Sequence, residues 1–287
     1  MEIFTKNRVK EILLCCFLII QFYGYSQNTK SSDTSLTISN IRVDILFPDK
    51  PAEGTIMVLP GWNFKCDDIC KKSNFCELAK NENYVLIMPD MLKSVYQSKV
   101  FPETREDWKH YPTLTWVTDT LIPYVQKKFK LLLPGQNNFL FGISTGGRGV
   151  AMLALYTTNI FKAGASLSGD YNQLMDLEDN LMKGYYGPYE KFPERWSGKD
   201  NPEKNAEQLK IPLFLAHGKA DNIVPCSQTI DFYNTISKLK PELGHKIVLN
   251  DTASHNYGFW QSEYSEALKF FKRHKISDKN TNQNSKR

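Results

Sequence analysis

The run Gly142-Ile143-Ser144-Thr145-Gly146 holds a serine between two glycines. A short apolar stretch at residues 138–141 precedes it, and a stretch with helical character at residues 148–156 follows. A serine at such a strand-to-helix bend needs small neighbours, because larger side chains would collide in the tight turn. The bend lifts the hydroxyl out of the backbone, above a helix N-terminus whose partial positive charge favours an anion. The run therefore predicts that Ser144 is a nucleophile.

A serine hydroxyl is a weak nucleophile at neutral pH, so it needs a base to remove its proton and an acid behind that base. After a bend of this kind, the partners follow in the order Ser, Asp or Glu, His. His255 lies in the loop between the last predicted strand and the last predicted helix, which is the position expected of the base. The other histidines precede the serine, lie at an end of a strand, or belong to the terminal helix: His110, His217, His245 and His274.

Asp221 is the predicted acid, because it follows the predicted strand at residues 211–216 by a short loop. His217, at the end of that strand, is expected to structure the turn. Two aspartates compete for the role of the acid. Asp251 lies four residues before His255, where a short polar side chain more commonly closes a turn. The other, Asp170, follows the strand after the serine.

Attack by the serine would create a negative oxygen that needs backbone donors, each worth about 10²–10³ in rate. The N–H of Thr145 directly follows the nucleophile and is one predicted donor. The loop Leu59-Pro60-Gly61-Trp62, after an early strand, is expected to supply the second through the N–H of Trp62. The alternative is an ordinary strand-ending turn with the Trp62 side chain packed over it.

These residues need elements that bring them together. Apolar, β-prone runs alternate with helix-period runs, which predicts a mostly parallel sheet with helices on both faces. Residues 36–47 alternate and predict antiparallel strands, whereas the continuous apolar run at 55–59 is typical of a buried parallel strand. A helix over residues 114–129 should be kinked by Pro123. Further strands are expected at 84–88, 162–167, 211–216 and 246–249, and further helices at 74–82, 227–239 and 260–274.

One α/β domain is expected over residues 36–275, with no internal repeat and no low-complexity linker. Every candidate residue falls in a loop at the carboxyl end of a strand, where ligands bind in such sheets. Residues 169–205 fit no strand–helix unit and are rich in aromatic residues. They are interpreted as a small cap-like insertion over the site, the alternative being a surface excursion that packs its own aromatic side chains.

The N-terminal 26 residues have the pattern of an export signal, with a basic start, an apolar run at 12–20, and Gly24 and Ser26 before a cleavage site. The apolar run is too short to span a bilayer comfortably, although an uncleaved anchor is an alternative. We therefore predict a secreted or periplasmic protein that is cleaved near Ser26 and makes no stable membrane insertion afterwards. A flexible segment is expected at 27–35 and a disordered tail at 276–287.

Charge is thinly spread over the chain. Removal of residues 1–26 takes three basic and two acidic residues, so the formal charge falls from +5 to +4. Much of the remaining positive charge is in residues 269–287, and nucleic-acid binding is not expected. An even number of cysteines remains in a compartment that permits disulfides, and three pairings are open; these are Cys66, Cys70, Cys76 and Cys226. One or two bridges are expected, because no CxxC pair or nearby histidine favours zinc.

Taken together, these motifs resemble those of α/β-hydrolases of the secreted esterase type, similar to esterase D and to feruloyl and acetyl-xylan esterases. The resemblance covers roughly residues 40–275, and its matching pieces are Leu59 to Trp62, Leu121 to Val125, Gly142 to Gly147, Gly218 to Pro225 and Ser254-His255. Esterase D relatives usually carry His before the nucleophile and Met after it, where this chain has Ile143 and Thr145. The first oxyanion loop also lacks the His-Gly-Gly run of many lipases. The resemblance implies an α/β-hydrolase fold and a serine esterase.

The leading hypothesis is a secreted serine carboxylesterase that works through an acyl-enzyme, with Ser144, His255 and Asp221 as triad and without a metal or organic cofactor. Aromatic residues in the predicted access loops suggest an acylated carbohydrate as substrate, with ordinary packing as the alternative: Tyr96, Phe101, Trp108, Tyr111, Tyr186 and Trp196. A thioesterase for glutathione conjugates fits poorly with export. Three alternatives remain: a prolyl-oligopeptidase-like peptidase, for which the length leaves no room for a propeller, a non-catalytic binding protein, and an acyltransferase to sugars.

Overall fold

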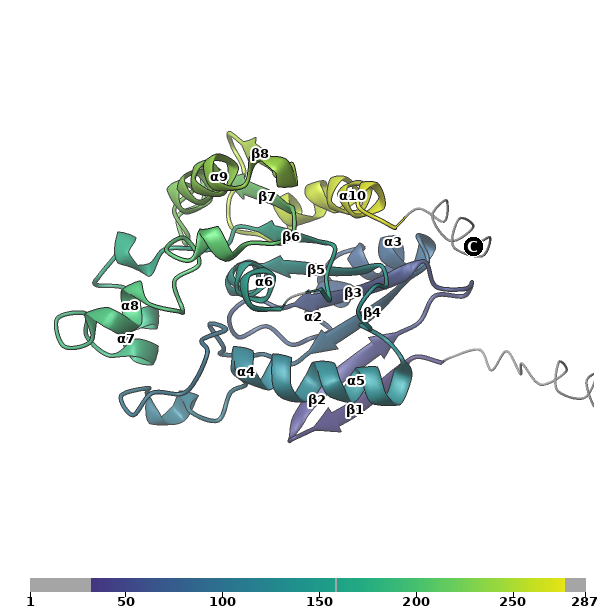
Figure 1. The fold of residues 1–287 in the computed structure, drawn as a ribbon, viewed down its shortest axis with the longest axis horizontal. Coiled ribbons are helices and arrows are strands. Elements are labelled where there is room, and N and C mark those ends of the chain that lie inside the picture. The colour runs from purple at the N-terminus through teal and green to yellow at the C-terminus, as the bar shows by residue number, and fades with distance from the viewer. Residues whose placement is uncertain (1–31, 158, 277–287) are drawn as a thin grey trace, which may run out of the picture. The chain divides into compact units, whose positions relative to one another are not determined.

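The computed structural model describes residues 32–157 and 159–276. The strands of this part of the chain form one eight-stranded sheet in the order β1-β2-β4-β3-β5-β6-β7-β8 (Figure 1). β2 pairs antiparallel with β1 and with β4, and the other neighbours pair parallel. The mostly parallel sheet and its antiparallel start are therefore as predicted. The strands are β1 Thr34–Ile38, β2 Ile41–Leu46, β3 Gly54–Leu59, β4 Tyr84–Pro89, β5 Asn138–Ile143, β6 Ala163–Leu167, β7 Leu213–Gly218 and β8 Lys246–Asn250.

Helices cover both faces of the sheet, because side chains alternate along each strand and both faces are apolar. One apolar core joins the sheet to α4, α5, α6 and α9, and another joins its opposite face to α2, α3 and α10 (Figure 1). The helices are α2 Asp68–Lys72, α3 Phe75–Asn81, α4 Leu114–Trp116, α5 Ile122–Phe129, α6 Thr145–Tyr156, α7 Asn180–Tyr186, α8 Pro193–Ser197, α9 Ser227–Leu239 and α10 Tyr257–Arg273. Short 3₁₀ segments lie at Glu106–Trp108, Gln173–Met175, Ala206–Gln208 and Pro241–Leu243.

The helix predicted over residues 114–129 is interrupted in the manner expected of Pro123. A π-helical segment, Val117–Leu121, separates α4 from α5, and the proline lies in the first turn of α5. A proline is tolerated there because the N–H that it lacks has no helical acceptor in a first turn. The helix ends at Lys130, which has a left-handed backbone.

Two boundary predictions need adjustment. The domain predicted to begin at residue 36 begins with β1 at Thr34, because Thr34 and Ser35 pair with Ile45 and Asp44 of β2. The last two residues of the segment predicted to be flexible, 27–35, are therefore part of the sheet. The predicted signal peptide lies outside the described residues, and so does the predicted tail except for Ile276, whose N–H bonds the Asn137 side chain.

The cysteines of the described residues form one disulfide. Cys70 and Cys76 are joined, which links α2 to α3. Cys66 and Cys226 are free thiols, and Cys66 is buried with its sulfur 3.6 Å from an Asp44 carboxylate oxygen. One bridge among these four cysteines agrees with the predicted one or two.

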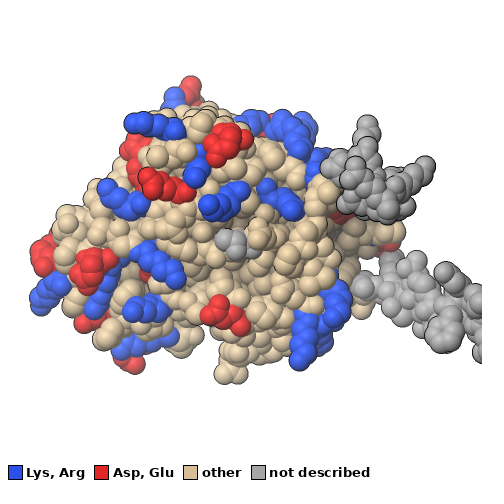
Figure 2. All heavy atoms as spheres, viewed as in Figure 1, with Lys and Arg blue, Asp and Glu red and all other residues tan. Residues whose placement is uncertain are grey.

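On the face shown in Figure 2, basic and acidic side chains are interspersed and separated by uncharged surface. Among the described residues, no helix combines the length and apolar character that a membrane span requires. Large apolar side chains that are exposed in this part of the chain are scattered along the sequence: Val100, Met175, Ile223, Leu239 and Ile276.

His245 supplies a testable pH dependence at the amino end of β7. Its Nδ1 accepts a hydrogen bond from the Leu213 N–H (3.1 Å), and burial lowers its pKa to about 4 from the ordinary 6.5. Between these values the unfolded chain binds more protons than the folded one. The free energy of unfolding should therefore fall as the pH drops from 6.5 towards 4, without further loss from this group below that. Urea midpoints measured across this range should change less in His245→Leu than in the native protein; equal slopes would contradict the assignment.

Candidate active site

Ser144 lies at the bend between β5 and α6. Its φ of 56° and ψ of −127° place a non-glycine residue in a strained backbone region. The glycines beside it make room for the bend: a Cβ on Gly142 would lie 2.1 Å from the Gly146 carbonyl oxygen, and a Cβ on Gly146 would lie 2.0 Å from that of Leu59. The tight turn predicted from the motif is therefore present, and it is packed against the end of β3.

Three side chains that are distant in the sequence form one hydrogen-bonded chain. The Ser144 hydroxyl lies 2.9 Å from His255 Nε2, and His255 Nδ1 lies 2.6 Å from Asp221 Oδ2. A carboxylate can only accept, so the proton is assigned to Nδ1, and Nε2 is free to accept from the serine. The Asp221 side chain is fully buried and the His255 side chain is 10% exposed. The structure thus brings together the three residues selected by chain order.

Pairing between β7 and β8 explains why the acid and the base meet. Gly218, at the end of β7, lies opposite Asn250, at the end of β8. The loops that follow are then joined, because Lys219 N–H donates to the Asn250 carbonyl (2.7 Å) and Ala220 N–H to that of Ala253 (3.0 Å). A Cβ on Gly218 would lie 2.2 Å from the Ala253 oxygen. This close approach fixes the acid loop against the base loop.

The carboxylate of Asp221 accepts four hydrogen bonds. Its Oδ1 accepts from the N–H groups of Ile223 and Val224 (both 2.9 Å), and its Oδ2 from His255 and from His217 Nε2 (3.1 Å). Burial alone would raise the pKa of Asp221, but the hydrogen bonds from His217, His255 and the Val224 amide hold it well below its usual range. His217, which the sequence analysis assigned to the turn, contacts the acid itself. Its spacing of four residues before Asp221 was the one signal of this contact.

The two competing aspartates are engaged elsewhere. Asp170 Oδ2 accepts from the buried guanidinium of Arg148 (3.2 Å). Asp251 is exposed, and its carboxylate lies 2.7 Å from Lys219 Nζ. Neither supplies the carboxylate that His255 contacts, which leaves Asp221 in that position.

The loop after β3 passes beside the serine. Leu59 pairs with Gly142 in the parallel register of β3 and β5, so both strands end at the same edge of the sheet. A Cβ on Gly61 would lie 3.1 Å from the Ser144 Cβ. Tyr96 holds this loop by donating its hydroxyl hydrogen to the Pro60 carbonyl (2.9 Å).

The predicted oxyanion donors are both available. Within residues 32–157 and 159–276, no acceptor is bonded to the N–H of Trp62 or of Thr145. The Trp62 ring meanwhile packs edge-on against Trp108 (centroids 4.9 Å apart) and Tyr185 (6.0 Å). The packing alternative for the side chain and the donor prediction for the backbone are therefore compatible. The arrangement can activate a serine and place two N–H groups beside it.

The match to a family model decides the family. Residues 79–276 match the model described as the prolyl oligopeptidase family, and this range contains Ser144, Asp221 and His255. The chain belongs to the prolyl oligopeptidase family. A search of curated proteins gave no match.

Solved structures similar to this family member have the α/β-hydrolase fold. FphF, a fluorophosphonate-binding serine hydrolase of Staphylococcus aureus, is 20% identical with a TM-score of 0.67, over 83% of this chain and 96% of that one. An S-formylglutathione hydrolase of Agrobacterium tumefaciens is 17% identical with a TM-score of 0.69, over 88% and 99%. An acylaminoacyl peptidase of Pyrococcus horikoshii is 14% identical with a TM-score of 0.63, over 89% of this chain but 44% of that chain. The predicted α/β-hydrolase fold is confirmed, and the protein is a serine hydrolase of this superfamily.

Most of the aromatic side chains proposed to stack on sugars are packed inside this prolyl oligopeptidase family member. Four of the six are nearly or fully buried: Tyr96, Trp108, Tyr186 and Trp196. Phe101 is half-buried, with the Lys99 ammonium and the Arg195 guanidinium 5.4 Å and 4.8 Å from its ring centroid. The packing alternative therefore accounts for four of these aromatics. Trp62, which packs against the cluster of Trp108 and Trp196, directly follows the Gly61 that lies close to Ser144.

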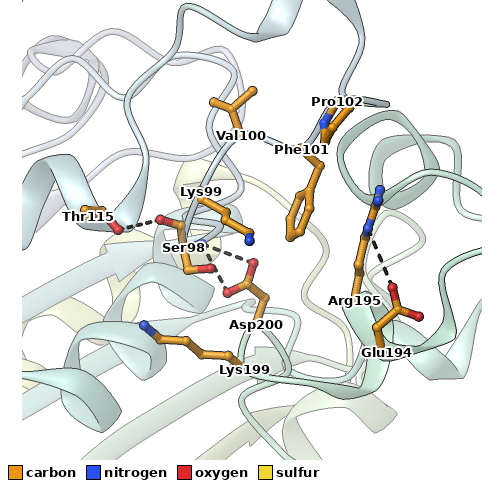
Figure 3. Close-up of a pocket in the computed structure, with 10 residues that line it drawn as sticks. All are labelled: Ser98, Lys99, Val100, Phe101, Pro102, Thr115, Glu194, Arg195, Lys199 and Asp200. Atoms are coloured by element: carbon orange, nitrogen blue, oxygen red, sulfur yellow. Dashed lines mark hydrogen bonds and ion pairs between the residues drawn. The ribbon is translucent and has the colours of Figure 1, made fainter.

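A hollow of about 700 Å³ lies between the loop at residues 98–102 and residues 194–200 of the insertion (Figure 3). The buried Asp200 carboxylate accepts from the Ser98 N–H at its base (3.1 Å). No residue of the Ser144 site lines it. In the described part of the chain, no group of three or more His, Cys, Asp or Glu side chains is arranged to hold a metal ion.

Proposed function

We propose that this protein is a serine carboxylesterase that works through an acyl-enzyme. The observation that carries the proposal is the continuous hydrogen-bonded chain from Ser144 through His255 to Asp221, together with the N–H groups of Trp62 and Thr145, which bond no acceptor in the described part of the chain. A buried, ionised carboxylate fixes the tautomer of the base, and free N–H groups are what an oxyanion requires.

The reaction follows from these positions. His255 Nε2 removes the proton as Ser144 Oγ attacks the ester carbonyl, and the N–H groups of Trp62 and Thr145 stabilise the oxyanion. The imidazolium, held by Asp221, then protonates the leaving alcohol. Water attacks the acyl-enzyme by the reverse route, with His255 again as base. No step of this route calls for a metal or an organic cofactor.

One comparison supports an ester rather than a peptide as substrate. A hydrolase similar in fold, with a TM-score of 0.69, is named for a thioester, S-formylglutathione, whose carbonyl reacts by the same acyl transfer. The family name keeps a peptidase as the alternative outcome of the test. Acylated carbohydrate stays a prediction from the sequence, as does export after cleavage near Ser26.

The test is a substrate panel with an active-site blank. The purified protein is assayed on acetyl, butyryl, octanoyl and feruloyl esters, on an acetylated xylo-oligosaccharide, and on dipeptide and acylaminoacyl amides, with Ser144→Ala as blank. We expect ester hydrolysis, labelling by a fluorophosphonate, and loss of both in the blank. Cleavage of the amides in preference to the esters would favour the peptidase, and absence of labelling in the native protein would refute the triad assignment.

A further inference from the structure

His217 lies directly behind the acid of the site. It belongs to β7, its side chain is fully buried, and each ring nitrogen has a partner. Nε2 lies 3.1 Å from Asp221 Oδ2 and 3.0 Å from the Val224 carbonyl oxygen, and Nδ1 lies 2.6 Å from Thr229 Oγ1. The ring therefore bridges the acid loop to the start of α9.

The partners of the ring determine where its protons are. Nε2 faces a carboxylate and a carbonyl oxygen, which can only accept, so Nε2 carries a hydrogen. In the neutral ring, Nδ1 then accepts from the Thr229 hydroxyl. His255 donates its Nδ1–H to the same Asp221 oxygen from the other side. Two imidazoles thus donate to one carboxylate oxygen.

Two further buried hydroxyls bond each other near Thr229. The Tyr171 hydroxyl lies 2.6 Å from Ser166 Oγ. Ser166, Tyr171, Thr229 and His217 have no measurable exposure, so water is not available to replace any of them. With the proton positions assigned to His217, the Thr229 hydroxyl donates to Nδ1 of the ring, and Nε2 of the ring donates to Asp221.

We propose that His217 is a positioning residue that acts through Asp221, and that Thr229 sets its tautomer. Two backbone amides hold Oδ1, whereas His217 is the partner that holds Oδ2 when the His255 ring moves between serine and leaving group. This inference rests on the proposed function, because it assumes that Asp221 orients His255 in turnover. The buried Thr229 hydroxyl, 2.6 Å from Nδ1, holds the ring in one orientation.

The test compares His217→Leu, which cannot donate, with His217→Gln, whose amide can donate to Asp221 and accept from Thr229. Hydrolysis of an acyl ester is measured well below the melting temperature of each variant. We expect kcat of His217→Leu to fall about tenfold to one-hundredfold, because a lost hydrogen bond to a buried charge costs that much in rate, with KM nearly unchanged. The Gln variant should recover most of kcat.

His245→Leu is the matched control, since this histidine bonds Leu213 at the start of β7, whereas His217 and the acid lie at its other end. It should lower stability without lowering kcat. If His217→Leu does not fold, Thr229→Val, which keeps the shape and removes the hydroxyl, should lower kcat in the same sense. A kcat of His217→Leu within twofold of native, or equal losses in the Leu and Gln variants, would overturn the inference.

Failure of the proposed function gives a different result. If the native protein neither hydrolyses esters nor reacts with a fluorophosphonate, the triad assignment is refuted and this inference falls with it. If the native protein is active and labelled through Ser144, and His217→Leu is labelled at the native rate, only the positioning role of His217 is refuted.

Discussion

Asp221→Asn should lower kcat for ester hydrolysis about 10⁴-fold, because the wrong tautomer of the base is then stabilised. The structure shows which way the amide will face. Oδ1 accepts from two backbone N–H groups, those of Ile223 and Val224, so the amide oxygen must take this position. The NH₂ group then replaces Oδ2 and donates to His255 Nδ1. Nε2 of that ring must carry the proton, and it can no longer accept from Ser144.

The measurements that check this are kcat, KM and the rate of fluorophosphonate labelling. KM should change little, since the amide has the same shape as the carboxylate. The melting temperature should fall, because the NH₂ group would face the buried Nε2–H of His217 and neither group could accept. The matched control is Asp251→Asn, whose carboxylate pairs with Lys219 in solvent. An exposed pair contributes little, so its kcat should stay within about twofold of native. A larger loss of kcat in Asp251→Asn than in Asp221→Asn would show that Asp251, in the neighbouring loop, is the acid.

The three side chains selected from the sequence meet in the fold because each was chosen by a local rule. A serine between glycines, after an apolar run and before a helical one, needs no knowledge of distant residues. Asp221 and His255 were selected because parallel strands end at one edge, and the register of β7 and β8 brings their loops together there. The predicted helices and strands agree with those of the structure for the same reason, because apolar patterns and the position of Pro123 are local features of the sequence.

The parts that the sequence did not predict depend on contacts between distant segments. The role of His217 requires Thr229, on another element, to fix its ring, and no spacing indicates that pair. The aromatic residues of the access loops were interpreted as a binding surface, but Trp108 and Trp196 are buried because the loop at residues 93–111 packs against residues 169–205. Cysteine pairing likewise depends on the separation of side chains in space, which leaves Cys226 without a partner thiol.

Arg148 is the clearest example of such a distant contact. It lies in α6, four residues after Ser144. In the structure its side chain is fully buried and donates to the Val95 carbonyl (3.1 Å), the Asp170 carboxylate (3.2 Å) and Gln173 Oε1 (3.2 Å). It also donates to the Asp200 carbonyl at the end of the insertion. A single guanidinium thus ties the nucleophile helix to both ends of residues 169–205.

Arg148→Met should therefore lower the free energy of unfolding by about 3–5 kcal/mol, because it leaves a buried carboxylate and several carbonyls without their donor. Burial already raises the pKa of Asp170 despite the arginine beside it. Without the arginine that pKa should rise further, so the loss should be larger at pH 8 than at pH 5, where the carboxyl can bind a proton. The double variant Arg148→Met/Asp170→Asn should recover part of the loss.

Urea unfolding and proteolysis within residues 169–205 measure these effects. The control is Arg105→Met, which removes an exposed arginine paired with Asp107. That control should cost less than about 1 kcal/mol, and equal losses in the two single variants would show that Arg148 does not hold the insertion.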